Sequence, residues 1–162
     1  MAWTVIDHEE LTGAVASWTS TTIPSSYDHL CLMASVKTDQ SGAIYSAQLV
    51  QFNGDDAAHY ASTNIYAWST SNFSVDHADV GEYDGFSFPQ VAGPVSASET
   101  FGTMMVWVPD YANTVNHKAV FIHSTAPYAA SLDGQTKLTG GRWEDTSAVT
   151  SITVIPGFSG DL

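Results

Sequence analysis

Apolar and polar residues alternate along much of the chain, and a period of two along the sequence predicts β-strands. The clearest alternations lie in residues 99–108 and 148–155, and the first is apolar on both sides, as in a strand buried on both faces. Further strands are predicted where apolar runs end at turn residues, in segments 14–20, 29–37, 47–52, 60–68, 85–89, 117–124 and 140–143. Together, about eight or nine strands predict an all-β fold, an antiparallel β-sandwich of the jelly-roll type.

Helical periodicity over three turns is weak throughout the chain. Its best candidate, residues 7–18, also contains β-branched residues and glycine, so this segment stays ambiguous between helix and strand. Residues 69–85 are polar and predict a long loop. Because the chain has no repeats or linkers, we predict one domain over residues 1–162, in which residues 1–22 form an N-terminal strand or arm.

The charge balance of the chain is strongly acidic. Its 162 residues include 17 acidic and 4 basic residues, which gives a net charge of −13. The basic residues, Lys37, Lys118, Lys137 and Arg142, are too widely spaced to form a basic patch. Because such a field repels phosphate groups, we expect neither nucleic acid nor a membrane surface as a partner. No run approaches the ~18 apolar residues that are needed to span a bilayer.

The sequence lacks the motifs of common catalytic sites. It contains no Gly-x-Ser-x-Gly nucleophile elbow, no phosphate-binding loop and no His-x-x-x-His metal spacing. We therefore predict no catalytic residue, no cofactor and no enzymatic activity. A hydrolase on a sandwich scaffold remains an alternative, because the fold alone does not decide the function.

Four acidic residues in the predicted loop form a candidate cation site: Asp76, Asp79, Glu82 and Asp84. Calcium binds several hard oxygen ligands that one loop can supply. This loop lacks the alternation of oxygen ligands around a central glycine that a calcium loop shows. The favoured interpretation is therefore a set of solvated acids, and no metal is predicted.

Aromatic side chains offer candidate glycan contacts, because sugars stack on exposed rings of β-sandwiches. The candidates are Tyr83 in the polar loop and Trp143, together with Tyr66 and Trp68 in the strand predicted at 60–68. An aromatic ring in a β-domain belongs more often to the core than to a binding site. The core interpretation is weakest for Tyr83, because Tyr83 lies in a polar loop.

Two sets of turn residues have structural roles that the sequence predicts directly. Asn53–Gly54 forms a strong turn dipeptide because both residues tolerate a positive φ, and Asp55 can then cap exposed N–H groups. Asp110 and Asn113 can bond the local backbone in an Asx-type turn. Tyr111 can bury its ring while its hydroxyl finds a backbone partner.

Several segments of the chain also resemble, in order and spacing, a widespread group of tailed-bacteriophage virion proteins that is common in marine phages. The segments are IPSSYDHL (23–30), LVQFNGD (49–55), VPDYAN (108–113) with HK (117–118), and GRW (141–143) followed by TSAVTSIT (146–153). The resemblance covers roughly residues 23–155. The chain departs from many of these relatives after Ile155, so we expect the terminal edge strand of the group to be missing or altered here.

The resemblance implies a jelly-roll structural domain of the virion. We expect a capsid decoration (cement) protein that is made in the host cytoplasm and binds the major capsid protein on the capsid exterior. Such a protein would act as a small symmetric homo-oligomer, a trimer, and its acidic charge suits a position away from packaged DNA. The alternative is a tail or fibre component that binds a receptor or glycan.

Overall fold

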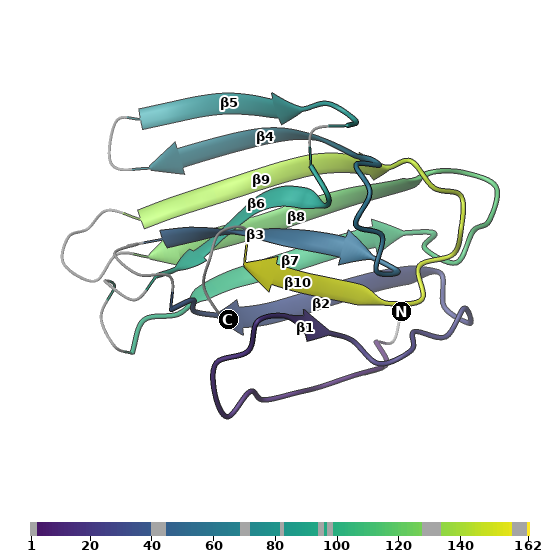
Figure 1. Ribbon diagram of the computed structural model, residues 1–162, viewed down its shortest axis with the longest axis horizontal. Helices are drawn as coiled ribbons and strands as arrows, with labels where there is room; N and C mark the ends of the chain where they lie inside the picture. The colour runs from purple at the N-terminus through teal and green to yellow at the C-terminus, as the bar shows by residue number, and fades with distance from the viewer. Residues whose placement is uncertain are drawn as a thin grey trace.

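The computed structural model describes residues 3–39, 45–68, 72–81, 83–93, 96, 99–127, 134–156 and 162. These residues form ten strands and no helix, and the strands make two antiparallel sheets packed as a β-sandwich (Figure 1). The fold class predicted from the alternation of apolar residues is confirmed. No helix suited to crossing a membrane is found in these ranges.

Strand bounds follow the chain order. The strands are β1 (Trp18–Thr19), β2 (His29–Val36), β3 (Tyr45–Phe52), β4 (Tyr60–Trp68), β5 (Asn72–Ala78), β6 (Phe86–Ala92), β7 (Gly102–Pro109), β8 (Lys118–Pro127), β9 (Gly134–Trp143) and β10 (Ile152–Pro156).

The two sheets differ in width. The four-stranded sheet has the order β1-β10-β3-β6, and the six-stranded sheet has the order β2-β7-β8-β9-β4-β5. Strand β6 packs across β7, β8 and β9, whereas the main contacts of β5 are with β4. The β4–β5 hairpin therefore extends past the four-stranded sheet, as Figure 1 shows at the top of the view.

The segment predicted as a long loop contains a strand, so that prediction is wrong. Strand β5 lies within residues 69–85 and pairs with most of β4, from Ser62 opposite Ala78 to Trp68 opposite Asn72. It is an edge strand with little core contact, so it carries polar residues on one side and exposed apolar residues on the other. Such a composition resembles a loop because burial, the usual source of a strand's apolar pattern, is missing.

Other strand boundaries also differ from the predicted ones. Strand β9 begins at Gly134, six residues before the predicted start at 140, and β1 is two residues long instead of spanning 14–20. The ambiguous segment 7–18 is not helical. Strand β6 continues through Pro89, which is tolerated because β6 is an edge strand with a register shift in its pairing to β3.

Four aromatic rings fill the core at one end of the sandwich. The Phe52 ring lies edge-on to Phe86, with centroids 5.4 Å apart, and to Trp143, at 5.6 Å. Tyr60 meets Phe86 edge-on at 4.9 Å. All four side chains are buried, and edge-to-face pairs of this kind add stability beyond the area they bury.

This packing leaves no space for a side chain at Gly141, although the neighbouring Gly140 faces open solvent. A Cβ at Gly141 would lie 2.6 Å from the Phe86 ring and 2.9 Å from Val120 Cγ1, whereas a Cβ at Gly140 would meet nothing within 4 Å. We expect Gly141→Ala to lower the free energy of unfolding by about 1–3 kcal/mol, because it overpacks the core. Gly140→Ala should change it by less than about 1 kcal/mol. Urea unfolding of the two variants tests this, and equal effects would contradict it.

Candidate functional site

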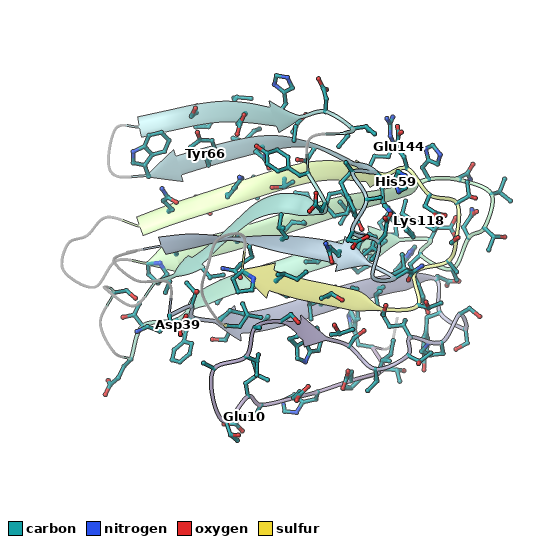
Figure 2. The ribbon with its side chains drawn as sticks, in the orientation of Figure 1. Glu10, Asp39, His59, Tyr66, Lys118 and Glu144 are labelled. Carbon is teal, nitrogen blue, oxygen red and sulfur yellow. The ribbon has the colours of Figure 1, made fainter. Side chains whose placement is uncertain are left out.

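The motifs singled out in the sequence meet at one end of the sandwich. Here the β3–β4 turn, the β7–β8 turn and the segment after β9 come together, and Figure 2 shows His59, Lys118 and Glu144 gathered there. We call the hydrogen-bonded residues of this end the end network; they are Asn53, Asp55, His59, Tyr60, Tyr111, Asn113, Lys118 and Trp143.

Asn53 ties the β3–β4 turn to the segment before β10. Asn53 and Gly54 both have a positive φ, 56° and 67°, as the Asn-Gly dipeptide predicts. The side-chain amide of Asn53 donates to the Ala148 carbonyl at 2.8 Å, and its Oδ1 accepts from the Thr150 N–H at 2.7 Å and the Ser151 N–H at 3.2 Å. One turn residue therefore satisfies three backbone groups that lie almost a hundred positions away in the sequence.

Asp55 joins the same turn to the last strand of the six-stranded sheet. Its Oδ1 accepts the Ala57 N–H at 3.0 Å, which confirms the predicted capping role. Its Oδ2 accepts the indole N–H of Trp143 at 2.6 Å and lies 2.9 Å from Nδ1 of His59. The carboxylate thus satisfies the one polar atom of a buried tryptophan side chain.

The electrostatics of Asp55 and His59 are coupled. Burial raises the pKa of Asp55, but the hydrogen bonds from Trp143, His59 and the Ala57 N–H outweigh it, so that the pKa is lowered overall. The hydrogen bond and the negative charge of Asp55 in turn raise the pKa of His59. The pair is therefore held as a carboxylate beside a histidine that favours its protonated form.

The Tyr60 hydroxyl bonds two backbone groups of the β3–β4 turn. Its hydroxyl donates to the Asp55 carbonyl at 3.0 Å and accepts the Phe52 N–H at 3.1 Å. Burial raises the pKa of Tyr60 above its usual range, which keeps this hydroxyl neutral and able to act as both donor and acceptor.

The β7–β8 turn confirms the predicted backbone bonding for Asn113 but not for Asp110, whose carboxylate bonds the Asn113 side chain instead. Asp110 has a φ of 50°, and its Oδ2 accepts the side-chain amide of Asn113 at 2.7 Å. Oδ1 of Asn113 accepts the Val115 N–H at 2.6 Å. Tyr111 is buried, and its hydroxyl donates to the Pro24 carbonyl, so its predicted role is also confirmed.

Lys118 is a member of the end network that sequence reasoning missed. It is only 2% exposed, and its Nζ donates to the carbonyls of Asn116 at 2.8 Å and Thr146 at 3.1 Å. Desolvation lowers its pKa, against the nearby charges of Asp145 and Asp110. A signal was present in the sequence, because Lys118 occupies the same side of its strand as the apolar Val120 and Ile122.

The end network is organised for structure, and its chemistry is limited. An Asp–His pair can activate a nucleophile when a serine hydroxyl bonds the outer ring nitrogen of the histidine. Among the described residues, His59 has no hydroxyl as a hydrogen-bond partner. Both side-chain oxygens of Asp55 are already bonded within the network.

A shallow groove of about 580 Å³ lies on the side of the six-stranded sheet that faces away from the four-stranded sheet. It runs over β5, β4, β9 and β8, where Gly140 presents no side chain, and Thr63, His77 and Arg142 line it. Arg142 forms an ion pair with Glu144. The groove is open to solvent along its length and brings no recognisable catalytic set together.

The acidic residues of the candidate cation loop are spread over different elements. Asp76 lies on β5 and Asp79 follows that strand, while the backbone carbonyl of Asp84 accepts the Gln51 amide at 2.7 Å. Glu82 lies outside the described residues. Within the described ranges, no group of three or more His, Cys, Asp and Glu residues is placed to hold a metal ion.

The two predicted glycan contacts differ in their exposure to solvent. Trp143 is 1% exposed, so its prediction as a glycan contact is wrong: its ring packs in the core and its N–H is bonded to Asp55. Tyr83 is partly exposed. Tyr66 and Trp68 stack on each other with centroids 5.0 Å apart, toward the other end of β4 (Figure 2).

Comparison of the chain with protein-family models, with curated proteins and with solved structures finds no match.

The lowered pKa of Asp55 predicts a pH-dependent contribution to stability. Its carboxylate stabilises the fold above the ordinary pKa of 3.8 and loses this contribution as the pH falls through the lower folded value. We expect Asp55→Asn to cost about 1–3 kcal/mol of unfolding free energy at pH 7 and progressively less toward pH 3. Urea unfolding of both proteins across this range measures the difference, and a gap that is constant with pH would contradict the prediction.

The hydroxyl of Tyr111 can be tested separately. Tyr111→Phe leaves the Pro24 carbonyl without this donor, and we expect it to lower the free energy of unfolding by about 1–1.5 kcal/mol. Tyr27→Phe is the matched control, because Tyr27 is 37% exposed and should tolerate the change within about 0.5 kcal/mol. Thermal unfolding monitored by circular dichroism compares the two, and a loss of the same size in the control would argue against the hydrogen bond.

Proposed function

We propose that this chain is a structural protein of a tailed-bacteriophage virion, a decoration protein that binds the outer surface of the capsid and stabilises it. Its partner is the major capsid protein, and it binds as a symmetric homo-oligomer on the capsid exterior. Many copies on a repeating lattice reinforce one another, so that weak shape-matched contacts suffice.

One observation carries this proposal: the segments that resemble the virion proteins meet in the end network. Asn53 of the second segment bonds Ala148 of the last one, and Tyr111 bonds Pro24 of the first. The contacts support a resemblance of the whole fold, and the function that goes with this resemblance is our proposal for the chain.

The strand order supports the jelly-roll type within the β-sandwich. Strands β7 and β8 lie between β2 and β9 in the six-stranded sheet. Without this pair, the sheets would have the orders β1-β10-β3-β6 and β2-β9-β4-β5, two four-stranded sheets like the eight strands of a jelly roll. We therefore interpret β7 and β8 as a hairpin added to a jelly roll.

The acidic charge supports a position on the capsid exterior. A protein with a net charge of −13 is repelled by densely packed DNA and gains nothing from an inner position. The structure adds a scaffold for contact with a protein lattice, because two packed sheets hold their outer faces rigid.

A tail-associated glycan-binding module is the second candidate, and the Tyr66–Trp68 pair favours it. Both rings are partly exposed, and Nζ of Lys137 lies 5.5 Å from the centre of the Tyr66 ring. Burial lowers the pKa of Lys137 to about 8. Paired rings beside an amine and the nearby Asp76 resemble the polar and aromatic lining of a sugar site.

The copy number in purified particles distinguishes the two functions. A decoration protein should be present at on the order of hundreds of copies per virion, because it repeats with the capsid lattice, whereas a tail component should be present at about a dozen or fewer. We expect particles that lack the chain to lose their contents at a lower temperature and the purified protein to restore the wild-type value. Quantitative mass spectrometry and thermal release of DNA measure both quantities. A low copy number, or particles of unchanged heat resistance, would refute the decoration role.

A further inference from the structure

The side of the six-stranded sheet that faces away from the four-stranded sheet, here called the outward face, carries a row of six side chains, of which five are apolar and one is a histidine. The strand register places its members side by side across all six strands. In order from β2 to β5, the row is Met33, Met105, His123, Leu138, Ile65 and Val75. Its ends are the most exposed, with Met33 at 73% and Val75 at 61%. Phe73 and Phe121 add exposed rings on either side of the row.

The strand positions of the outward face include no carboxylate, although the chain has 17 acidic residues; Asp79, which follows β5, lines the groove at the edge of this face. The charged or titratable members of the outward face are Arg142, the free thiol of Cys31 and three histidines. The outward positions are every second residue of each strand, beginning with His29, Thr103, Ala119, Gly134, Ala61 and Phe73. The acidic charge of the molecule therefore lies elsewhere.

The size of this face suits a stable protein interface. Six strands about 4.8 Å apart, each contributing about seven residues of 3.4 Å, give roughly 700 Å² in projection. Each partner in a standard interface contributes about 800 Å². The exposed apolar side chains occupy part of this area, and apolar side chains that are gathered on one face mark an interaction surface more often than scattered ones do.

The charge pattern decides which partner fits. A basic surface would find no carboxylate at the strand positions of this face, and an acidic surface would find one permanent cation, Arg142, which is already paired with Glu144. The best complement is another neutral apolar surface of the same size, and the face itself is such a surface. Because oligomers of a single chain are most often two-fold, a face that can pair with itself points to a second copy.

We propose that the outward face binds the same face of a second copy of this chain. A two-fold axis that runs along the strands between β8 and β9 maps the row onto itself. It places Met33 opposite Val75 of the second copy, Met105 opposite Ile65, and His123 opposite Leu138. The proposal does not depend on the virion function, and the dimer that it predicts differs from the trimer that the resemblance implies.

Matched valine variants test the face. Val75 lies on it, whereas Val115 is 78% exposed on the β7–β8 turn and away from it. We expect the wild-type chain to sediment as a dimer at micromolar concentrations. Val75→Glu should weaken the dimer by at least about 100-fold, because each interface buries the new charge twice, and Val115→Glu should leave it unchanged. Val75→Lys should act like Val75→Glu, since either charge loses its hydration.

A double variant tests the two-fold pairing itself. Met33→Lys alone should also weaken the dimer, but combined with Val75→Glu it should restore association, because the axis brings the two new charges together. Analytical ultracentrifugation from about 1 to 100 μM measures all five variants, and circular dichroism confirms that each is folded. A wild-type monomer throughout this range, a trimer, or equal effects at Val75 and Val115 would overturn the proposal. A double variant weaker than both single variants would overturn it as well.

Discussion

The structure depends on one carboxylate placed where a buried indole needs an acceptor. Asp55 follows a tight turn that ends β3, and its Oδ2 accepts the N–H of Trp143 at the end of β9. Without an acceptor there, the largest core side chain would leave a donor unsatisfied inside the sandwich. With Asp55 as the acceptor, Trp143 can be buried in the aromatic cluster, and the turn between β3 and β4 is bonded to the six-stranded sheet. The interaction thus couples the two layers at the point where their rings interlock.

The same end of the molecule explains why the functional proposals concern surfaces. Asn53, Tyr111 and Lys118 each bond backbone groups of distant segments, and Asp55 bonds the indole of Trp143. Their polar atoms are committed to holding the sandwich together, and these bonds would have to break before the atoms could act on a substrate. What such a scaffold offers to partners is the shape and the charge of its outer faces.

The sequence predicted those features whose causes are local. Strand β4 was predicted with its observed bounds, and the Asn53–Gly54 turn follows from backbone conformations that only a few residue types tolerate. The features that depend on distant partners could not be predicted. Trp143 is buried because Asp55 accepts its N–H, and β5 is a strand because β4 pairs with it, although its own residues resemble a loop.

The position of β10 in the four-stranded sheet has a consequence for how the protein is made. This strand, the last in sequence among the described residues, lies between β1 and β3 and pairs with both of them. A ribosome must therefore release β10 before β1 can find its place, while the β7–β8–β9 meander is able to form earlier from contacts that are close in sequence. Folding during synthesis would proceed from the wide sheet to the narrow one, with the N-terminal strand docking after all the others.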